Sequence, residues 1–186
     1  RLALVTAMVA LALPAQATSV ITLTGNLSSD ATGTAQAQVL TSSTTYTLDS
    51  SEAAGTTQID QLDQFSGGSG TGGQLGAGQT GTITVTGFNR DGTDLSTGLT
   101  FTVTSTTTVN DLIDHLNNNV LTDATASFVN GQIRITDNET GCTKSDIALS
   151  YSGDGTLTSP SYFKVTTVGG TESKSVNIAV YDSQGG

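Results

Sequence analysis

The strongest constraint on the fold is the regular alternation of threonine with apolar residues in the middle of the chain. Residues 82–86 read TITVT and residues 99–104 read LTFTVT, so every second side chain is apolar. A period of two places those side chains on one face of a β-strand. Residues 89–92 between them read NRDG, a composition typical of turns. The pattern therefore predicts a β-hairpin with a loose loop and one buried face.

The pattern changes to that of a helix directly after this hairpin. Five apolar residues lie on one face of the predicted helix: Val109, Leu112, Ile113, Leu116 and Val120. Thr108 is a natural N-cap, and Asp111 favours the positive end of the helix dipole. We expect the three asparagines at residues 117–119 to fray the other end of the helix.

Two further alternating strands follow the helix. Residues 124–129 and 132–137 flank Asn130 and Gly131, a pair that favours a type I′ turn. We expect the sheet to resume at once after the helix, which makes residues 82–137 a β-β-α-β-β unit. Weaker patterns predict a short helical turn at residues 59–65 and extended segments at residues 20–23, 36–48, 147–151 and 162–168.

Composition supports a mainly β chain and excludes several partners. Threonine occurs 35 times and glycine 22 times in 186 residues, and both favour strands and turns over helices. Only 12% of the residues are charged, and the formal net charge is -10. Nucleic acid and anionic membranes repel such a chain, so neither is an expected partner. The single cysteine, Cys142, cannot form an intramolecular disulfide, so cysteine usage does not define the redox compartment.

The last segment of the chain indicates how its domains are arranged. Residues 176–180 read VNIAV, the pattern of a half-buried strand, which needs a neighbouring strand. The best candidate lies far upstream, at residues 19–27. If the two strands pair, everything between them is an insertion. We therefore predict a discontinuous inner β-domain formed by residues 1–50 and 160–186, and an inserted β-rich outer domain with one short helix at residues 51–159.

A glycine-rich segment contains a motif that is known from dinucleotide-binding folds. Gly68, Gly70 and Gly73 fit the pattern G-x-G-x-x-G. A phosphate site needs a strand that leads into the motif and a helix that leaves it, and the sequence predicts neither. We therefore interpret residues 66–81 as a flexible loop.

His115 is the only histidine and thus the main candidate for acid-base chemistry. It lies beside Asp114 and four residues after Asp111, so a carboxylate could orient the imidazole or raise its pKa. Its position, roughly 120° from the centre of the apolar stripe, favours a solvated histidine on the helix surface. No other catalytic group is predicted near it.

Two oxygen-rich turns could bind calcium weakly. They comprise Asn89, Asp91 and Asp94 around Gly92, and Asp137, Asn138 and Glu139 before Gly141. Neither completes the EF-hand pattern with its terminal glutamate, and the chemistry of turns explains both. No G-x-S-x-G motif marks a nucleophilic serine. The sequence assigns no catalytic, cofactor-binding or metal-binding residue, and we expect a protein that is not an enzyme.

Residues 1–17 fit two interpretations. Residues 2–13 are apolar and residues 15–17 read AQA, which together resemble a secretory signal with its cleavage site, too short to span a membrane. The chain also begins with arginine rather than methionine, as an internal segment would.

Both ends of the chain resemble the bacterial flagellar hook protein. Residues 18–31 read TSVITLTGNLSSDA and residues 176–186 read VNIAVYDSQGG; they are similar to the GNL segment and the VYDS-x-G strand that flank a variable outer region in hook proteins. The middle resembles the insert of large hook proteins, in the stretches GTITVTGFNRDGTDL, FTVTSTTTVNDLIDHLNNNV and ATASFVNGQIRITDNETG. Hook proteins are exported by the flagellar type III apparatus without a cleaved signal, so the resemblance favours the internal interpretation of residues 1–17. It also implies helices before residue 1 and after residue 186, so that this chain is a fragment without the terminal helices.

The resemblance implies a structural subunit of the extracellular hook, next to the flagellar basal body. Copies stack into a curved tube that transmits torque from rod to filament while it bends. The implied partners are other copies and the rod, hook-cap and hook-filament junction proteins, and no cofactor is implied. Short hydroxyl side chains suit such contacts, because they make few ion pairs and lose little rotamer entropy. Two other classes stay open: a secreted, threonine-rich surface adhesin or binding module, and an enzyme that acts through His115.

Overall fold

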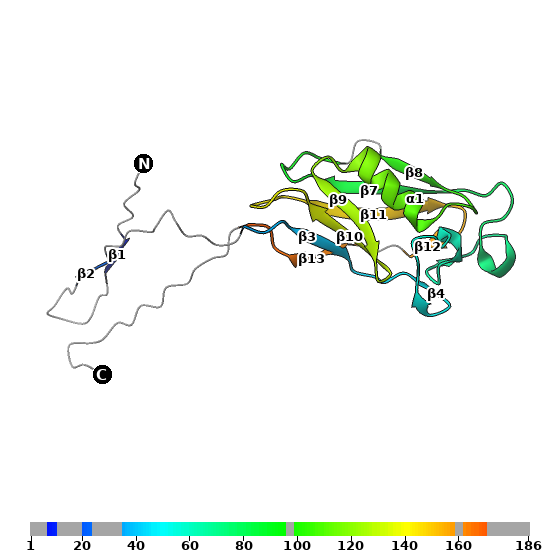
Figure 1. Ribbon diagram of the computed structural model, residues 1–186, viewed down its shortest axis with the longest axis horizontal. Coiled ribbons are helices and arrows are strands. Elements are labelled where there is room, and N and C mark those ends of the chain that lie inside the picture. The colour runs from blue at the N-terminus through cyan, green and yellow to red at the C-terminus, as the bar shows by residue number, and fades with distance from the viewer. Residues whose placement is uncertain (1–6, 11–19, 24–34, 96–98, 159–161, 171–186) are drawn as a thin grey trace. The chain divides into compact units, whose positions relative to one another are not determined.

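The computed structural model describes residues 7–10, 20–23, 35–95, 99–158 and 162–170 (Figure 1). Most of its regular elements are β-strands, which confirms the predicted mainly β class. The chain divides into two compact units, one formed by Arg1–Gly33 with Ser173–Gly186 and the other by Thr34–Glu172.

In the first unit, β1 (Ala7–Ala10) pairs antiparallel with β2 (Val20–Leu23). The predicted strand at residues 176–180 lies outside the described residues. Its pairing with residues 19–27 therefore stays a prediction, as do the predicted domain boundaries.

Two antiparallel sheets form most of the second unit. The four-stranded sheet has the order β13 (Phe163–Thr167), β3 (Val39–Ser42), β10 (Gln132–Asp137) and β9 (Ala124–Val129). The three-stranded sheet has the order β11 (Asp146–Gly153), β7 (Gly81–Phe88) and β8 (Thr100–Val103). Two short ladders complete the unit: β12 (Thr156–Leu157) with β6 (Phe65–Ser66), and β4 (Thr47–Leu48) with β5 (Ser51–Glu52).

Both predicted hairpins form. In the first, β7 pairs with β8 so that Ile83 lies opposite Phe101. In the second, β9 pairs with β10 around Asn130 (φ 51°) and Gly131 (φ 70°). Positive φ angles at both central residues define the type I′ turn, so the predicted turn is confirmed.

The predicted continuous β-β-α-β-β sheet is wrong, because the two hairpins belong to different sheets. The first hairpin pairs through β7 with β11, whereas the second pairs through β10 with β3. Each hairpin has one apolar face, and both faces are buried in one shared core. The helix between the hairpins carries the chain from one sheet to the other.

Helix α1 (Val109–His115) begins as predicted. The Thr108 hydroxyl accepts a hydrogen bond from the Asp111 N–H, and the Asp111 carboxylate accepts one from the Thr108 N–H at 2.8 Å. This capping box satisfies two N–H groups at the helix start. All five predicted apolar residues of the helix segment are buried, as expected for one face of an amphipathic helix.

The predicted fraying at residues 117–119 is wrong. The chain continues as a π-helical turn, η3 (Leu116–Val120). The Asn117 side chain holds this turn, because its amide donates to the Ala126 carbonyl at 3.0 Å and its oxygen accepts from the Ala126 N–H at 2.7 Å. The side chain thus replaces a neighbouring strand at the middle of the outer edge of β9.

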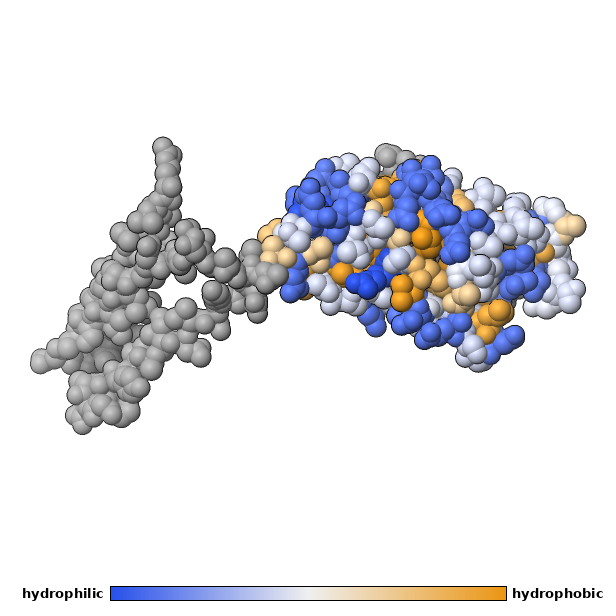
Figure 2. Space-filling model, in the orientation of Figure 1, coloured by the Kyte–Doolittle hydropathy of each residue, from blue (hydrophilic) through white to orange (hydrophobic). Residues whose placement is uncertain are grey.

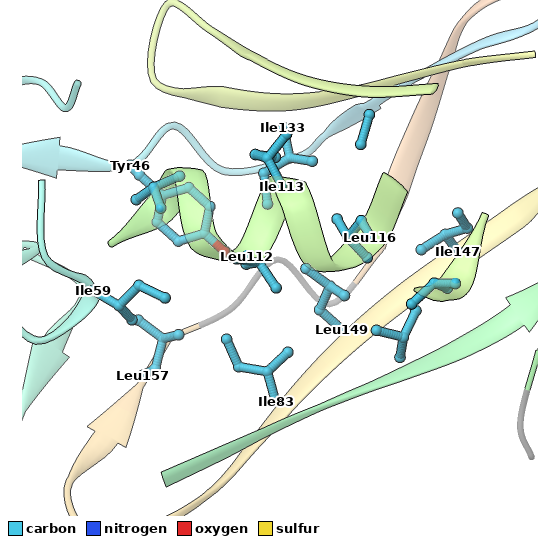
Figure 3. Packing of buried hydrophobic residues seen from close by; sticks show 14 of the residues in the cluster. Tyr46, Ile59, Ile83, Leu112, Ile113, Leu116, Ile133, Ile147, Leu149 and Leu157 are labelled. Carbon is cyan, nitrogen blue, oxygen red and sulfur yellow. The ribbon is translucent and has the colours of Figure 1, made fainter. Parts of the chain in front are cut away.

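The core lies between the helix and the two sheets (Figure 3). Ile113 lies beside Ile133 of β10, whereas Leu112 and Leu116 face Ile83 and Leu149 of the other sheet. Leu116 and Ile133 are fully buried. Loops contribute as well, since Leu75 and Leu95 are buried in the same cluster.

Candidate functional site

The described residues beneath α1 leave little space between them. The apolar gap there, lined by Tyr46, Leu112 and Ile133 among others, has a volume of about 10 Å³. Such a gap holds about one water molecule. On the face shown in Figure 2, apolar residues form small separate patches rather than one continuous groove. Candidate sites therefore lie in surface clefts.

The glycine motif forms a closed loop. Gly68 donates its N–H to the Gly73 carbonyl, and Gly70 donates to the Gln74 carbonyl, both at 2.8 Å. A Cβ atom on Gly68 would collide with the Gln74 carbonyl, which explains the need for glycine there. The motif contains only the three-residue 3-10 turn η2 (Thr71–Gly73), so the predicted loop is confirmed and the helix of a phosphate site is missing from this segment.

His115 is less exposed than the predicted solvated histidine on the helix surface. Its imidazole is half-buried and packs on the Phe101 ring, with 5.1 Å between the ring centroids. Burial lowers its pKa. The Asp111 carboxylate is engaged by Thr108 in the capping box, so it does not orient the imidazole. The ring nitrogen Nδ1 instead lies 3.2 Å from the side-chain nitrogen of Asn119.

The two oxygen-rich turns, which the sequence analysis treated separately, meet in the structure. They line a cleft of about 340 Å³ that includes Asp91, Asp123, Asn138 and Glu139. Arg90 belongs to this cleft too, and its guanidinium bonds to Glu139 at 3.1 Å and to the Thr140 carbonyl at 2.7 Å.

The acidic side chains of these turns are engaged in local hydrogen bonds. Asp91 accepts from the N–H and the hydroxyl of Thr93, which lowers its pKa. Asp137 is buried and accepts from the Ser145 hydroxyl at 2.7 Å. In the described part of the chain, no three His, Cys, Asp or Glu side chains lie close enough to hold a metal ion. Turn chemistry and the Arg90 guanidinium therefore account for both turns.

The predicted helical turn near residue 59 is confirmed as the 3-10 turn η1 (Ile59–Gln61). A second cleft, which no pattern in the sequence indicated, lies beside this turn. Its volume is about 370 Å³, and its walls carry the carboxylates of Asp49, Asp60 and Asp63. We call it the acidic cleft. Sequence patterns gave no signal for it, because its residues come together only when the loops fold.

Asp60 is the unusual member of the acidic cleft. The residue is 3% exposed, and its Oδ2 accepts one hydrogen bond from the Leu75 N–H at 3.2 Å. Its Oδ1 is buried and has no hydrogen-bond partner within the described residues. Burial raises the pKa of this carboxyl group. An incompletely satisfied carboxylate of this kind is costly unless a donor or cation compensates it.

Asp63 is held at the mouth of the same cleft. Its two carboxylate oxygens accept from the N–H groups of Asp49 at 3.0 Å and Ser50 at 2.8 Å. A hydrogen bond from the Thr47 side chain and the bond from Ser50 lower its pKa. Asp63 therefore stays charged beside the buried Asp60.

The base of the second unit is the third notable feature. Gln36 donates its N–H to the Gly170 carbonyl at 2.9 Å, and Gly170 donates back to the Gln36 carbonyl at 3.2 Å. These residues lie near the beginning and the end of the unit. The chain therefore enters and leaves the unit at one place.

No protein-family model, curated protein or solved structure was found to match the chain. Among the helices that the structure describes, none has the length and apolar character needed to cross a membrane.

Proposed function

We propose that the chain is a structural subunit of the bacterial flagellar hook, and that its inserted outer domain is the second unit, residues 34–172, which extends beyond the predicted bounds of 51–159 at both ends. The paired base, Gln36 with Gly170, carries this proposal. A domain inserted into another must receive and return the chain at neighbouring points, and these two residues meet that requirement. The hook-like segments at residues 18–31 and 176–186 lie on either side of this unit in the sequence.

The surface chemistry also supports a structural role. The apolar gap beneath α1 is too small for a substrate, and the strands expose many threonine hydroxyls. A subunit that slides against its neighbours as a tube bends needs contacts of this weak, polar kind. Other copies and the rod, hook-cap and junction proteins of the flagellum are the proposed partners.

The paired base provides a sharp test in the full-length gene. Residues 37–169 are replaced by an Asn-Gly turn, which joins Gln36 to Gly170 across a gap that their hydrogen bonds already close. We expect cells with this change to assemble thinner hooks, seen by electron microscopy. A control that replaces residues 53–169 joins Glu52 to Gly170, which do not pair, and is expected to prevent assembly.

Deletion of the gene is a second test of the hook proposal. We expect it to abolish hooks and motility. Hooks that form normally without this gene would overturn the proposal. Cleavage of the mature protein before Thr18, found by N-terminal sequencing, would instead support the secreted adhesin or binding module.

A further inference from the structure

The outer face of the four-stranded sheet holds two cations in one row. Arg134 of β10 and Lys164 of β13 both lie opposite Thr41 of the intervening strand β3. Directly opposite residues point to the same face of a sheet, so both side chains lie on one side of it. With strands about 5 Å apart, the two residues are separated by roughly 10 Å. Both are exposed.

Neither Arg134 nor Lys164 forms a salt bridge within the described part of the chain. The salt bridge found there joins Arg90 to Glu139, and Lys144 lies near Asp91. The neighbours of Arg134 in the register are Thr41 and Ser127, which carry no charge. Two unpaired cations are notable in a chain that has sixteen acidic and six basic residues.

Exposed apolar side chains lie in and next to β13 as well, although Val165 lies opposite the buried Leu40 and therefore faces the other side of the sheet from Lys164. Tyr162, Val165 and Val168, in and next to β13, are 55%, 50% and 74% exposed. They are three of the five large apolar side chains recorded as exposed in the described residues. We call the shared face of Arg134 and Lys164 the β13 surface. Apolar and aromatic side chains with arginine are typical of protein interfaces.

The acidic cleft has the opposite composition. Asp49, Asp60 and Asp63 line it, and the described residues provide no salt bridge to any of them. The buried Asp60 Oδ1 has no partner, so the site lacks a positive or donating group. Its volume of about 370 Å³ is sufficient for the end of a lysine or arginine side chain.

We propose that the β13 surface of one copy docks on the acidic cleft of a second copy. The charges are complementary, and a cation entering the cleft offsets the charge of Asp60. The two regions occupy different places on the unit, with β13 and β4 at separate positions in Figure 1. Where such a contact is heterologous, each copy keeps one free surface and one free cleft, so that growth is open-ended.

A second copy fits better than an anionic polymer. The net charge of -10 repels nucleic acid and acidic polysaccharide over the whole molecule, whereas docking on the cleft places the cations among carboxylates. The inference deepens the proposed function, because it names the contact through which outer domains would stack. The contact itself does not depend on the proposed function, but its role in the hook does.

The test measures self-association of the full 186-residue chain by sedimentation velocity. A surface variant, Arg134→Gln with Lys164→Gln, removes both cations. A cleft variant, Asp49→Asn with Asp60→Asn, removes two carboxylates while keeping their shapes, and Asn tolerates the positive φ of 52° at position 49. Lys144→Gln and Asp114→Asn serve as matched controls, since both residues are exposed and lie outside the proposed contact.

We expect the wild-type chain to self-associate at low salt, and less at high salt where charges are screened. Each double variant should bind itself about tenfold or more weakly, whereas the controls should match the wild type. A mixture of the two variants should form heterodimers and nothing larger, because one intact surface meets one intact cleft. This mixture also shows that both variants are folded.

Several results would overturn the contact. The wild-type chain could stay monomeric at low salt, or the variants could associate as strongly as the wild type does. The mixture of variants could form no heterodimers. The wild type could also bind to heparin beads but not to itself. If deletion of the gene abolishes hooks but the variants self-associate as strongly as the wild type, this contact is overturned and the hook proposal stands. If the variants lose self-association as expected but hooks form normally without the gene, the contact stands and the hook proposal is overturned.

Discussion

Gln36 and Gly170 exchange two backbone hydrogen bonds, at 2.9 Å and 3.2 Å, although 134 positions separate them in the sequence. The antiparallel β-bridge between them continues the β3–β13 pairing toward the ends of the unit. The described core residues all lie between these two positions. Within the described residues, the unit thus closes on itself at this bridge.

A fragment of residues 34–172 is therefore expected to fold by itself. Its melting temperature, followed by circular dichroism, should lie within a few degrees of the main transition of the full chain, because the buried cluster is complete within it. A fragment that ends at residue 158 lacks β13 and should melt at a lower temperature. An unfolded 34–172 fragment would contradict the closure of the unit.

Asn117→Ala should destabilise the second unit by about 1–3 kcal/mol, because it leaves the N–H and the carbonyl of Ala126 without their side-chain partner. Urea unfolding measures the loss. Asn118→Ala is the matched control, since Asn118 is exposed, and its effect should stay within about 0.5 kcal/mol. Equal effects of the two changes would show that the Asn117 bonds are not needed.

Gly131→Ala should cost clearly more than Gly78→Ala. Both glycines have positive φ, 70° and 78°, so an alanine at either adds strain of about 1–2 kcal/mol. At position 131 the new Cβ would also lie 2.6 Å from the Tyr46 carbonyl, whereas at position 78 it meets nothing within 4 Å. Thermal unfolding of both variants separates strain from collision, and equal losses would contradict the close approach of Tyr46.

Stability should fall as His115 becomes protonated. Its pKa in the folded chain is below the ordinary value of 6.5, so the unfolded chain binds the proton more readily. The contribution is present above pH 6.5 and is lost as the pH falls from there through the lower pKa of the folded state. Urea unfolding at about pH 7 and about pH 5 should show a smaller loss for His115→Gln than for the wild type.

The carboxyl groups of Asp63, Asp91 and Asp111 provide an internal control for this pH series. Hydrogen bonds lower their pKa values in the folded chain, below the ordinary value of 3.8. Their contribution is therefore lost only as the pH falls below about 4. The raised pKa of Asp60 has the opposite effect on stability as the pH falls, so His115 is judged from the variant: a change between about pH 7 and about pH 5 that is equal in His115→Gln and the wild type would contradict the burial of His115.

Local features of the fold could be predicted because neighbouring residues determine them. Alternation with threonine identified the hairpins, Asn130 and Gly131 identified the type I′ turn, and Thr108 with Asp111 identified the helix start. The choice of sheet could not be predicted. Both hairpins have similar apolar faces, and only long-range pairing with β3 or β11 separates them.

The same distinction applies to the candidate sites. Gly68 and His115 are residue types that suggest chemistry, but the contacts around both are structural. No pattern pointed to Asp60, a polar residue between Ile59 and Gln61 in a short turn. The burial of that carboxyl group depends on Leu75, fifteen positions away, whose loop position has no periodic pattern.

The bonding of the Asn117 side chain to the Ala126 backbone has a consequence for the chain at high concentration. A long chain rich in threonine and poor in charge is at risk of cross-β aggregation through free strand edges. One edge of the four-stranded sheet is blocked at Ala126, and the other, β13, has an irregular register between Val165 and Thr167 next to the charged Lys164. Both edges of the four-stranded sheet are thereby protected from amyloid-like pairing, while its side chains remain available for reversible contacts.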